Sequence, residues 1–410
     1  MEEIATNSVV EVEQGSIVSP KGFAATGIHT GMKRKRFDLG AIVCSVPASA
    51  AAVYTTNRIQ AAPLKVTKES LAKEGKLQAL VVNSGNANAC TGARGLADAY
   101  AMRKQGANHF NLAEHYVAVT STGVIGEYLD MDKLLSGIEQ LQPSATYDGA
   151  EAFNQAILTT DTVNKKACFQ TVINGEVVTV GGVAKGSGMI NPQMATMLSF
   201  VTTDAVIDSS VLQQALTDIT NNTFNQITVD GDTSTNDMVV VMASGLADHE
   251  KLTPHHPDWV GFYQALTLTC QSLAQQIARD GEGATKLIEV CVKGALTNED
   301  AGKIAKKVVG SDLVKSAVYG TDANWGRIIC AIGYSGCEIN PETIDIAIGP
   351  IQTLENSQPI RFSEEKAKAY LEENDTITID VDLHLGEGNG KAWGCDLSYD
   401  YVRINAGYRT

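Results

Sequence analysis

Residues 184–200 read AKGSGMINPQMATMLSF, and Thr196 is the member of this segment whose type and setting suggest the most distinctive chemistry. A threonine at a chain N-terminus can use its own α-amine as the base for its hydroxyl, because an α-amine has a pKa of about 7.7–8. An internal threonine gains that amine by attacking the preceding carbonyl, which forms an ester that water then opens. The small Ala195 leaves room for this attack, and nearby glycines and a proline allow the strained turn that it requires. The alternative is that Thr196 only begins the apolar segment that follows.

A second stretch has the residue types of an oxyanion site. The segment TSTGVIGEYL (120–129) places Thr122 and Gly123 directly after the apolar pattern YVAVTS. A hydroxyl and a backbone N–H at this point could both face a developing oxyanion, and removal of one such donor typically costs about 3 kcal/mol of transition-state stabilisation. The alternative is an ordinary glycine turn at a strand end. The segment NSGNANACTG (83–92) is likewise either a loop that shapes the backbone beside the site or a simple turn.

Other catalytic chemistries have less support in the sequence. There is no G-x-S-x-G nucleophile elbow, and the seven histidines lie mostly in polar loops or near strand ends. The glycine-rich segments GEGATK (281–286) and GEGNGK (386–391) do not satisfy the phosphate-loop pattern. The adjacent His255 and His256 have no carboxylate or cysteine at a ligand step, so we expect no metal site. Acyl chemistry in this chain therefore needs a base other than histidine.

Composition narrows the class of partner. The chain has 410 residues and a formal net charge of −15, so its long-range field repels nucleic acid and anionic membrane surfaces. An anionic small substrate would need local cations, for which Lys185 and Arg327 are candidates. The first residues lack an apolar signal region, and no run reaches about 18 apolar residues. Eight scattered cysteines without a C-x-x-C pair fit a reducing compartment, so we expect a cytoplasmic protein with small-molecule partners.

The elements that must position these residues are mixed in type. Short β-branched runs predict strands within residues 41–46, 77–83, 116–121, 169–184, 237–244, 286–295, 343–349 and 376–386. Asn174 and Gly175, between two apolar runs, predict a tight hairpin. Apolar residues at three- and four-residue steps predict a long helix over 258–281. Further helices are predicted around 131–141, 209–222, 299–309 and 363–373. Consecutive strands, hairpins and helices together predict an α/β protein with α+β layering.

Five segments together closely resemble the ornithine acetyltransferase family, also called bifunctional glutamate N-acetyltransferases. They are KGSGMINPQMATML, TSTGVIG, NSGNANACTG, TTDT (159–162) and DGDTSTND (230–237). The resemblance implies an arginine-biosynthesis enzyme that cuts itself between Ala195 and Thr196, giving an α chain of residues 1–195 and a β chain of residues 196–410. It also implies an α/β/β/α-type sandwich with two mixed sheets, which resembles but is distinct from N-terminal-nucleophile hydrolases. The two fragments are expected to fold together and to pair as an α2β2 assembly.

The same resemblance implies roles for individual residues. Thr196 matches the nucleophile that becomes acetylated, and Thr122 with Gly123 matches the oxyanion pair. Besides Thr196 itself, the positions that match substrate-binding residues are Thr159, Lys185, Glu282, Asn405 and Thr410. The implied reaction moves the acetyl group of N-acetylornithine to glutamate through an acetyl-threonine, without a bound cofactor or metal. Bifunctional members also accept acetyl-CoA as donor, and no feature of this sequence separates the two kinds.

Two alternatives remain open on the residues. A self-processing N-terminal-threonine aminopeptidase or amidohydrolase would keep the cleavage but pass its acyl group to water. A non-catalytic ligand-binding protein would keep the chain uncut. The acceptor of the acyl group distinguishes the first alternative, and the presence of two fragments distinguishes the second.

Overall fold

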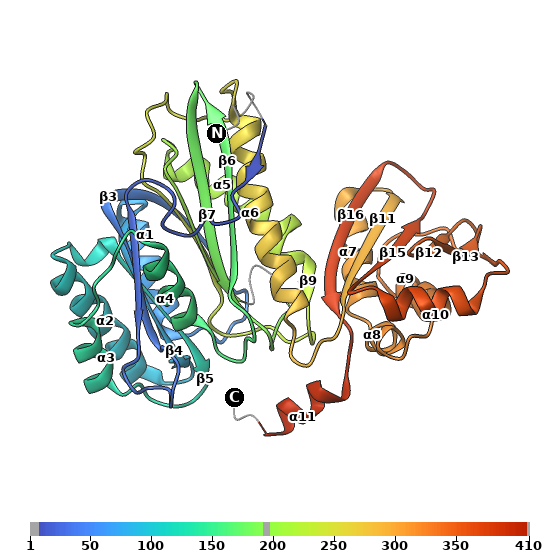
Figure 1. The fold of residues 1–410 in the computed structure, drawn as a ribbon, viewed down its shortest axis with the longest axis horizontal. Helices are drawn as coiled ribbons and strands as arrows, with labels where there is room; N and C mark the ends of the chain where they lie inside the picture. Colours follow the sequence, from blue (N-terminus) through green and yellow to red (C-terminus); the bar gives the residue numbers. More distant parts are fainter. Residues whose placement is uncertain (1–7, 192–196, 408–410) are drawn as a thin grey trace.

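A nine-stranded mixed sheet organises the N-terminal half of the chain in the computed structural model, which describes residues 8–191 and 197–407 (Figure 1). The strand order is β1-β6-β7-β8-β10-β3-β4-β5, and β2 pairs with one end of the long strand β3. The pairs β4/β5 and β8/β10 are parallel, whereas the other neighbours are antiparallel. The strands of this sheet are β1 (Val10–Glu11), β2 (Phe23–Ile28), β3 (Leu39–Tyr54), β4 (Lys76–Asn86), β5 (Val117–Val124), β6 (Lys165–Ile173), β7 (Glu176–Lys185), β8 (Leu198–Thr203) and β10 (Met238–Ala243).

Helices cover both faces of this sheet, because its central strands carry apolar side chains on both sides. On one face α4 packs against β2 and β3, where Phe153 meets Phe200 with ring centroids 5.6 Å apart. On the other face α5 and α6 form a second core with β6, β7 and β10. The helices of this half are α1 (Ala62–Glu74), α2 (Gly92–Phe110), α3 (Met131–Ile138), α4 (Tyr147–Ile157), α5 (Ser209–Asn222) and α6 (Trp259–Arg279), with a short 3₁₀ turn, η1 (Glu114–Tyr116).

A seven-stranded mixed sheet forms the C-terminal half, in the order β14-β13-β12-β15-β11-β16-β9. Helices α7 to α10 pack mainly on one of its faces. Its strands are β9 (Ile227–Thr228), β11 (Leu287–Ala295), β12 (Asp345–Ile348), β13 (Ile351–Glu355), β14 (Gln358–Pro359), β15 (Thr376–Asp382) and β16 (Gly388–Cys395). The helices are α7 (Asn298–Val309), α8 (Asp312–Tyr319), α9 (Trp325–Gly333), α10 (Glu364–Glu373) and α11 (Tyr399–Gly407), and the 3₁₀ turn η2 (Phe224–Gln226) precedes β9.

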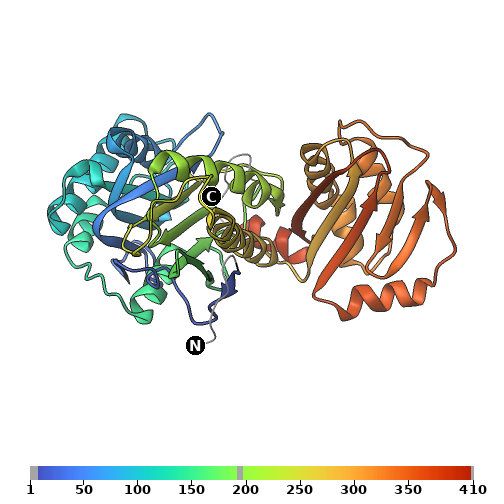
Figure 2. The ribbon, with the colours of Figure 1, turned by 90° about the horizontal axis from the view of Figure 1, so that it is seen from above.

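The long helix α6 connects the two halves. Its apolar residues at three- and four-residue steps, such as Phe262, Leu266 and Leu273, are fully buried, as the sequence pattern predicts. Trp393 and Cys395 of β16 join the same core as α6, so the helix lies between the two sheets (Figure 2). The two mixed sheets with helical layers agree with the predicted fold class, although α6 separates the sheets where the expected sandwich would stack one on the other.

Two features of this fold position the site. The strand β8 begins directly after the segment that contains Thr196 and is held between β7 and β10 in the middle of the first sheet. The helix α11 follows the last strand of the seven-stranded sheet and runs back beneath the end of the first body, which is the nine-stranded sheet with its helices (Figure 1). Within the described ranges, no helix is long and apolar enough to cross a membrane.

Candidate active site

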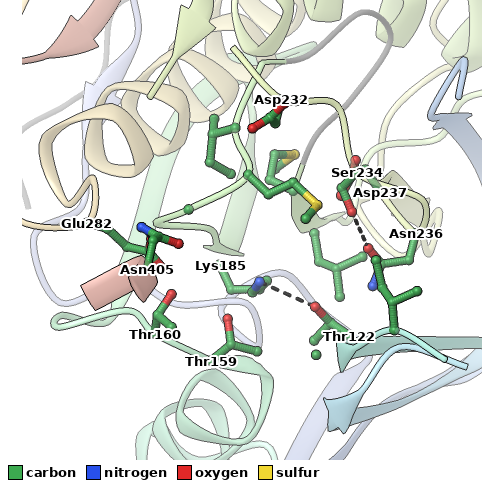
Figure 3. A pocket seen from close by; sticks show the side chains of 17 residues that line it. Thr122, Thr159, Thr160, Lys185, Asp232, Ser234, Asn236, Asp237, Glu282 and Asn405 are labelled. Carbon is green, nitrogen blue, oxygen red and sulfur yellow. Dashed lines mark hydrogen bonds between the residues drawn. The ribbon is translucent and has the colours of Figure 1, made fainter. Parts of the chain in front are cut away.

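A cavity of about 220 Å³ lies where β5, β7 and β8 approach α11 (Figure 3). Pockets for drug-sized ligands span about 300–1,000 Å³, so this cavity suits a smaller metabolite. Six of the predicted site residues line it, namely Thr122, Gly123, Thr159, Lys185, Glu282 and Asn405. These residues are separated by up to 283 positions in the chain, and the fold brings them to one place. Met197 and Leu198, which follow Thr196 directly in the sequence, line the same cavity.

The predicted oxyanion pair lies at the end of β5. Gly123 has φ +132°, and a Cβ atom there would lie 2.3 Å from the backbone carbon of Gly85, so only glycine fits. This close approach follows from the parallel pairing of β4 with β5, which places Gly85 opposite Gly123. The side chain of Asn86 donates to the carbonyls of Glu127 and Tyr128, each at 3.1 Å. The segment 83–92 therefore comprises the end of β4 and the loop that leads to α2, and its strand part shapes the backbone beside the pair.

Lys185 ends β7 with its side chain inside the protein. Its Nζ donates to Oγ1 of Thr122 at 3.3 Å (Figure 3). Burial lowers the pKa of Lys185 below its usual value, and the nearby carboxylate of Asp161 opposes that shift. Because an ammonium group only donates, the hydroxyl hydrogen of Thr122 stays available for an oxyanion.

A buried ionic network supports this wall of the cavity. Lys165 donates to Asp161 at 2.7 Å and to Asp280 at 2.6 Å. Asp161 also accepts from the backbone N–H of Thr159 at 2.9 Å and of Gly186 at 2.6 Å, and so it fixes residues on either side of the cavity. Burial alone would raise the pKa of Asp161, but Lys165 and Lys185 hold it well below its usual range. No local sequence pattern predicts this network, although Asp161 lies inside the TTDT segment (159–162).

Glu282 and Asn405 lie together at one end of the cavity (Figure 3). The side-chain amide of Asn405 donates to Oε2 of Glu282 at 2.8 Å, and the backbone N–H of Glu282 donates to the carbonyl of Ser187 at 2.9 Å. A Cβ atom at Gly188 would lie 2.4 Å from the Glu282 carboxyl group, so a glycine is needed there. The segment GEGATK thus serves as a turn after α6 that presents a carboxylate.

The segment 230–237 forms another wall of the cavity, a position that its sequence alone does not indicate. Asp230 accepts from the backbone N–H groups of Met189 at 2.6 Å and Ile190 at 2.9 Å, which holds the segment that leads towards Thr196. The side-chain amide of Asn236 donates to the carbonyl of Ser121 at 2.6 Å. The lining residues that were not predicted individually are Ile125, Thr160, Gly188, Met189, Ile190, Met197, Leu198, Asp232, Ser234, Asn236 and Asp237.

Some predicted residues lie elsewhere. Arg327, a candidate cation for an anionic substrate, is on α9, which packs on the seven-stranded sheet. Its guanidinium donates to the carbonyl of Leu313 at 2.7 Å. It does not line the cavity, so Lys185 is the candidate that the structure places there. Ala195, Thr196 and Thr410 lie outside the described residues.

Comparison with known proteins gives the family. A model of the ArgJ family matches residues 24–410. The chain belongs to the ArgJ family. It is 72% identical over 405 residues to the arginine biosynthesis bifunctional protein ArgJ of Halalkalibacterium halodurans, covering 99% of this chain and 98% of that protein. The ArgJ protein of Geobacillus kaustophilus is 66% identical over 405 residues, covering 99% of this chain and 98% of that protein.

A crystal structure of an ArgJ protein from Bacillus halodurans is also similar, with 74% identity and a TM-score of 0.51. All of that solved chain matches, and it covers 52% of this one. ArgJ membership confirms the resemblance that the sequence motifs indicated, and with it an acyltransferase of arginine biosynthesis. It also excludes the non-catalytic alternative.

Proposed function

We propose that this chain transfers the acetyl group of N-acetylornithine to glutamate through an ester on Thr196. As a bifunctional ArgJ protein it is an ornithine acetyltransferase of arginine biosynthesis, and the proposed part is the route through an ester on Thr196. One observation supports this route most directly. Six predicted site residues line a single cavity together with Met197 and Leu198, which follow Thr196 in the chain.

The α-amine that Thr196 needs would come from cleavage of the Ala195–Thr196 bond. The solved chain of the 74% identical relative covers 52% of this chain, and a fragment running from residue 196 to the end would be of similar length. The sheet topology supports an assembly in which the fragments stay together. Such a fragment contributes β8 and β10 to the first sheet, between β7 and β3 of the other fragment.

The first half-reaction forms the acetyl-enzyme. The α-amine of Thr196 takes the hydroxyl proton while Oγ attacks the acetyl carbonyl of N-acetylornithine. The hydroxyl of Thr122 and the backbone N–H of Gly123 donate to the oxyanion that forms on the carbonyl oxygen. When the adduct collapses, its bond to the ornithine nitrogen breaks, that nitrogen receives the proton, and ornithine leaves.

The second half-reaction uses glutamate. Its amine attacks the acetyl-threonine ester at the same oxyanion pair, which releases N-acetylglutamate and restores the hydroxyl. Lys185 offers a buried positive charge for a substrate carboxylate, and Glu282 offers a negative charge for a substrate ammonium group. The donor acetylates the Thr196 hydroxyl and leaves before the acceptor attacks the resulting ester. Ping-pong kinetics with parallel double-reciprocal lines are therefore expected, and intersecting lines would contradict them.

Acetyl-CoA is the second donor in this proposal, in keeping with the bifunctional name of the relatives. It would acetylate the same hydroxyl, with release of the thiol. We place the enzyme in the cytoplasm, with no bound cofactor. The α2β2 assembly is supported by exposed apolar residues on α8 and α11, where Leu313 is 59%, Tyr399 78% and Val402 63% exposed.

Two assays test the proposal. A denaturing gel of the purified enzyme should give two bands on either side of half the chain's mass, and Thr196→Ala should give one uncut band. The processed enzyme should then be supplied with N-acetylornithine, with and without glutamate. A transferase makes N-acetylglutamate only when glutamate is present, whereas release of acetate regardless of glutamate would support the hydrolase alternative. Replacement of N-acetylornithine by acetyl-CoA should also yield N-acetylglutamate.

A further inference from the structure

Asp237 differs from the other buried carboxylates around the cavity. Its side chain is buried in the cavity wall, with 3% of the residue exposed, and its Oδ2 atom receives no hydrogen bond from any described residue. Asp161 and Asp280, by contrast, accept bonds on both carboxylate oxygens. A buried polar atom without a partner destabilises the fold, so its presence in the cavity wall calls for a role.

The surroundings of Asp237 make its carboxylate a strong base for its type. Burial raises its pKa well above the usual range, while Lys185 and the hydroxyl of Ser234 oppose that shift only in part. A carboxylate kept from water in this way gains more from accepting a proton than one on the surface does.

Strand pairing places Asp237 beside the residue that follows Thr196. Asp237 immediately precedes β10, and the N–H of Met238 donates to the carbonyl of Met197 at 3.0 Å. The parallel register of β8 and β10 begins with Leu198 opposite Met238. On its other side, the Asp237 carbonyl accepts from the N–H of Thr55 at 3.1 Å, which fixes the backbone at this position.

The uncut chain has a chemical requirement that the mature enzyme does not. Before cleavage the nitrogen of Thr196 is an amide, so it cannot act as the base for its own hydroxyl. No histidine lines the described part of the cavity. Lys185 is hydrogen-bonded to Thr122, and Glu282 is held by Asn405 at the far end of the cavity (Figure 3). Asp237 is the buried carboxylate that remains on the Met197 side.

We propose that Asp237 is the proton acceptor that starts cleavage of the Ala195–Thr196 bond, an inference that rests on the proposed self-cleavage. Its carboxylate takes the proton from Oγ of Thr196 as that oxygen bonds to the carbonyl carbon of Ala195, whose oxygen becomes an oxyanion. When this adduct collapses, the bond from that carbon to the Thr196 nitrogen breaks, and Asp237 returns the proton to the nitrogen. Water then hydrolyses the resulting ester, which leaves a carboxylate on Ala195 and a free hydroxyl and amine on Thr196.

The test follows the processing of the full-length chain after cell-free synthesis is stopped, on a denaturing gel sampled over time. Asp237→Asn should slow cleavage by at least about 100-fold, the lower end of the usual contribution of a general base. The matched control is Asp248→Asn, which alters an exposed carboxylate in the loop after β10, away from the cavity, and should leave the cleavage rate within twofold of the parent. Cleavage of Asp237→Asn at the parent rate would overturn the proposal.

A second variant separates proton transfer from a structural role. Asp237→Ala opens space for a small carboxylate, so added formate should restore cleavage in proportion to its concentration, whereas chloride should not. Absence of formate rescue in a chain that unfolds at the parent temperature would also overturn the proposal. So would a result in which Lys185→Met blocks cleavage and Asp237→Asn does not. If the parent chain itself is never cut at Ala195–Thr196, the proposed function fails instead, which keeps the two failures distinguishable.

Discussion

At the scale of single residues, the site depends on charges that are paired inside the protein. Lys165 is fully buried between Asp161 and Asp280, and these two carboxylates in turn fix Thr159, Thr162 and Gly186 through backbone N–H groups. Through Gly186 the network holds the backbone next to Lys185, and through Thr159 it holds a residue that lines the cavity. Lys165, Asp161 and Asp280 do not line the cavity themselves.

Thr122→Val should lower kcat by about 10²–10³-fold with little change in KM, because valine keeps the shape and removes one oxyanion donor. Steady-state kinetics with N-acetylornithine and glutamate measure both constants. Thr122→Ser, which keeps a hydroxyl, should retain most of the activity. A Thr122→Val enzyme within threefold of the parent kcat would contradict the oxyanion role.

Asp161→Asn should reduce the free energy of unfolding by about 3–5 kcal/mol at neutral pH, because it leaves Lys165 with an incomplete set of buried partners. Burial raises and the lysines lower the pKa of Asp161, with a net depression. Its carboxylate therefore stabilises the fold above the usual carboxyl range, and that contribution is lost as the pH falls through and below it. Urea denaturation at pH 7 and pH 3 measures the difference between variant and parent. A difference as large at pH 3 as at pH 7 would contradict this assignment.

At the scale of elements, local patterns in the sequence predicted a hairpin and five helices, whereas α1, α4, α8, α9 and α11 were not predicted. The hairpin at Asn174 and Gly175 and the helices α3, α5, α6, α7 and α10 lie where their patterns indicated. The helix α2 was missed because small residues fill its buried face, as with Ala99 and Gly106, so its apolar periodicity is weak. The segment GEGNGK, considered as a phosphate loop, instead begins the strand β16, where Gly390 packs against the backbone of α7.

Contacts in the candidate site could not be predicted from local sequence patterns. Segments such as TTDT and DGDTSTND were recognised as motifs, but the partners of their residues lie far away in the chain. Asp161 meets Asp280 through Lys165, a contact that no local pattern encodes. Asn405 reaches Glu282 only because α11 returns to the first body. The resemblance supplied Glu282 and Asn405 but not Asp161, Lys165 and Asp280, and the fold brings each set together.

Gly188→Ala should raise the KM for N-acetylornithine at least about tenfold, a loss that corresponds to 1.4 kcal/mol of binding. The new Cβ would lie 2.4 Å from the Glu282 carboxyl group and push it from its place beside Asn405. The matched control is Gly333→Ala on α9, where an added Cβ meets nothing within 4 Å. Initial-rate kinetics of both variants provide the comparison. Equal KM values for the two variants would contradict the role of Glu282 in substrate binding.

At the scale of the whole molecule, cleavage would not divide the protein into two folding units. The strands β8 and β10 lie inside the first sheet between β7 and β3, so each proposed fragment completes the core of the other. The proposed C-terminal fragment would also carry Glu282 and Asn405 to a cavity whose proposed oxyanion pair, Thr122 and Gly123, belongs to the N-terminal fragment. The proposed active site would therefore be shared between the two fragments.

A second feature of the whole molecule is the set of exposed apolar residues on α8 and α11, the surface proposed to join two αβ units. The rings of Tyr319 and Tyr399 meet edge to face at 5.8 Å, and Leu313 and Val402 are exposed on the same two helices. Leu313→Asp combined with Val402→Asp should shift the processed enzyme from α2β2 towards αβ in light scattering after size-exclusion chromatography. Val260→Asp on α6, which alters an equally exposed residue, is the control. Unchanged mass in the double variant would contradict an interface at this surface.

The most direct test of the account is the position of the acetyl group during turnover. Processed enzyme should be quenched after incubation with N-acetylornithine alone and mapped by peptide mass spectrometry. We expect one acetyl group on the peptide that begins at Thr196, attached at its Oγ, and its loss when glutamate is added before the quench. Acetyl groups on another side chain, or full activity in a chain that is still uncut, would contradict the account.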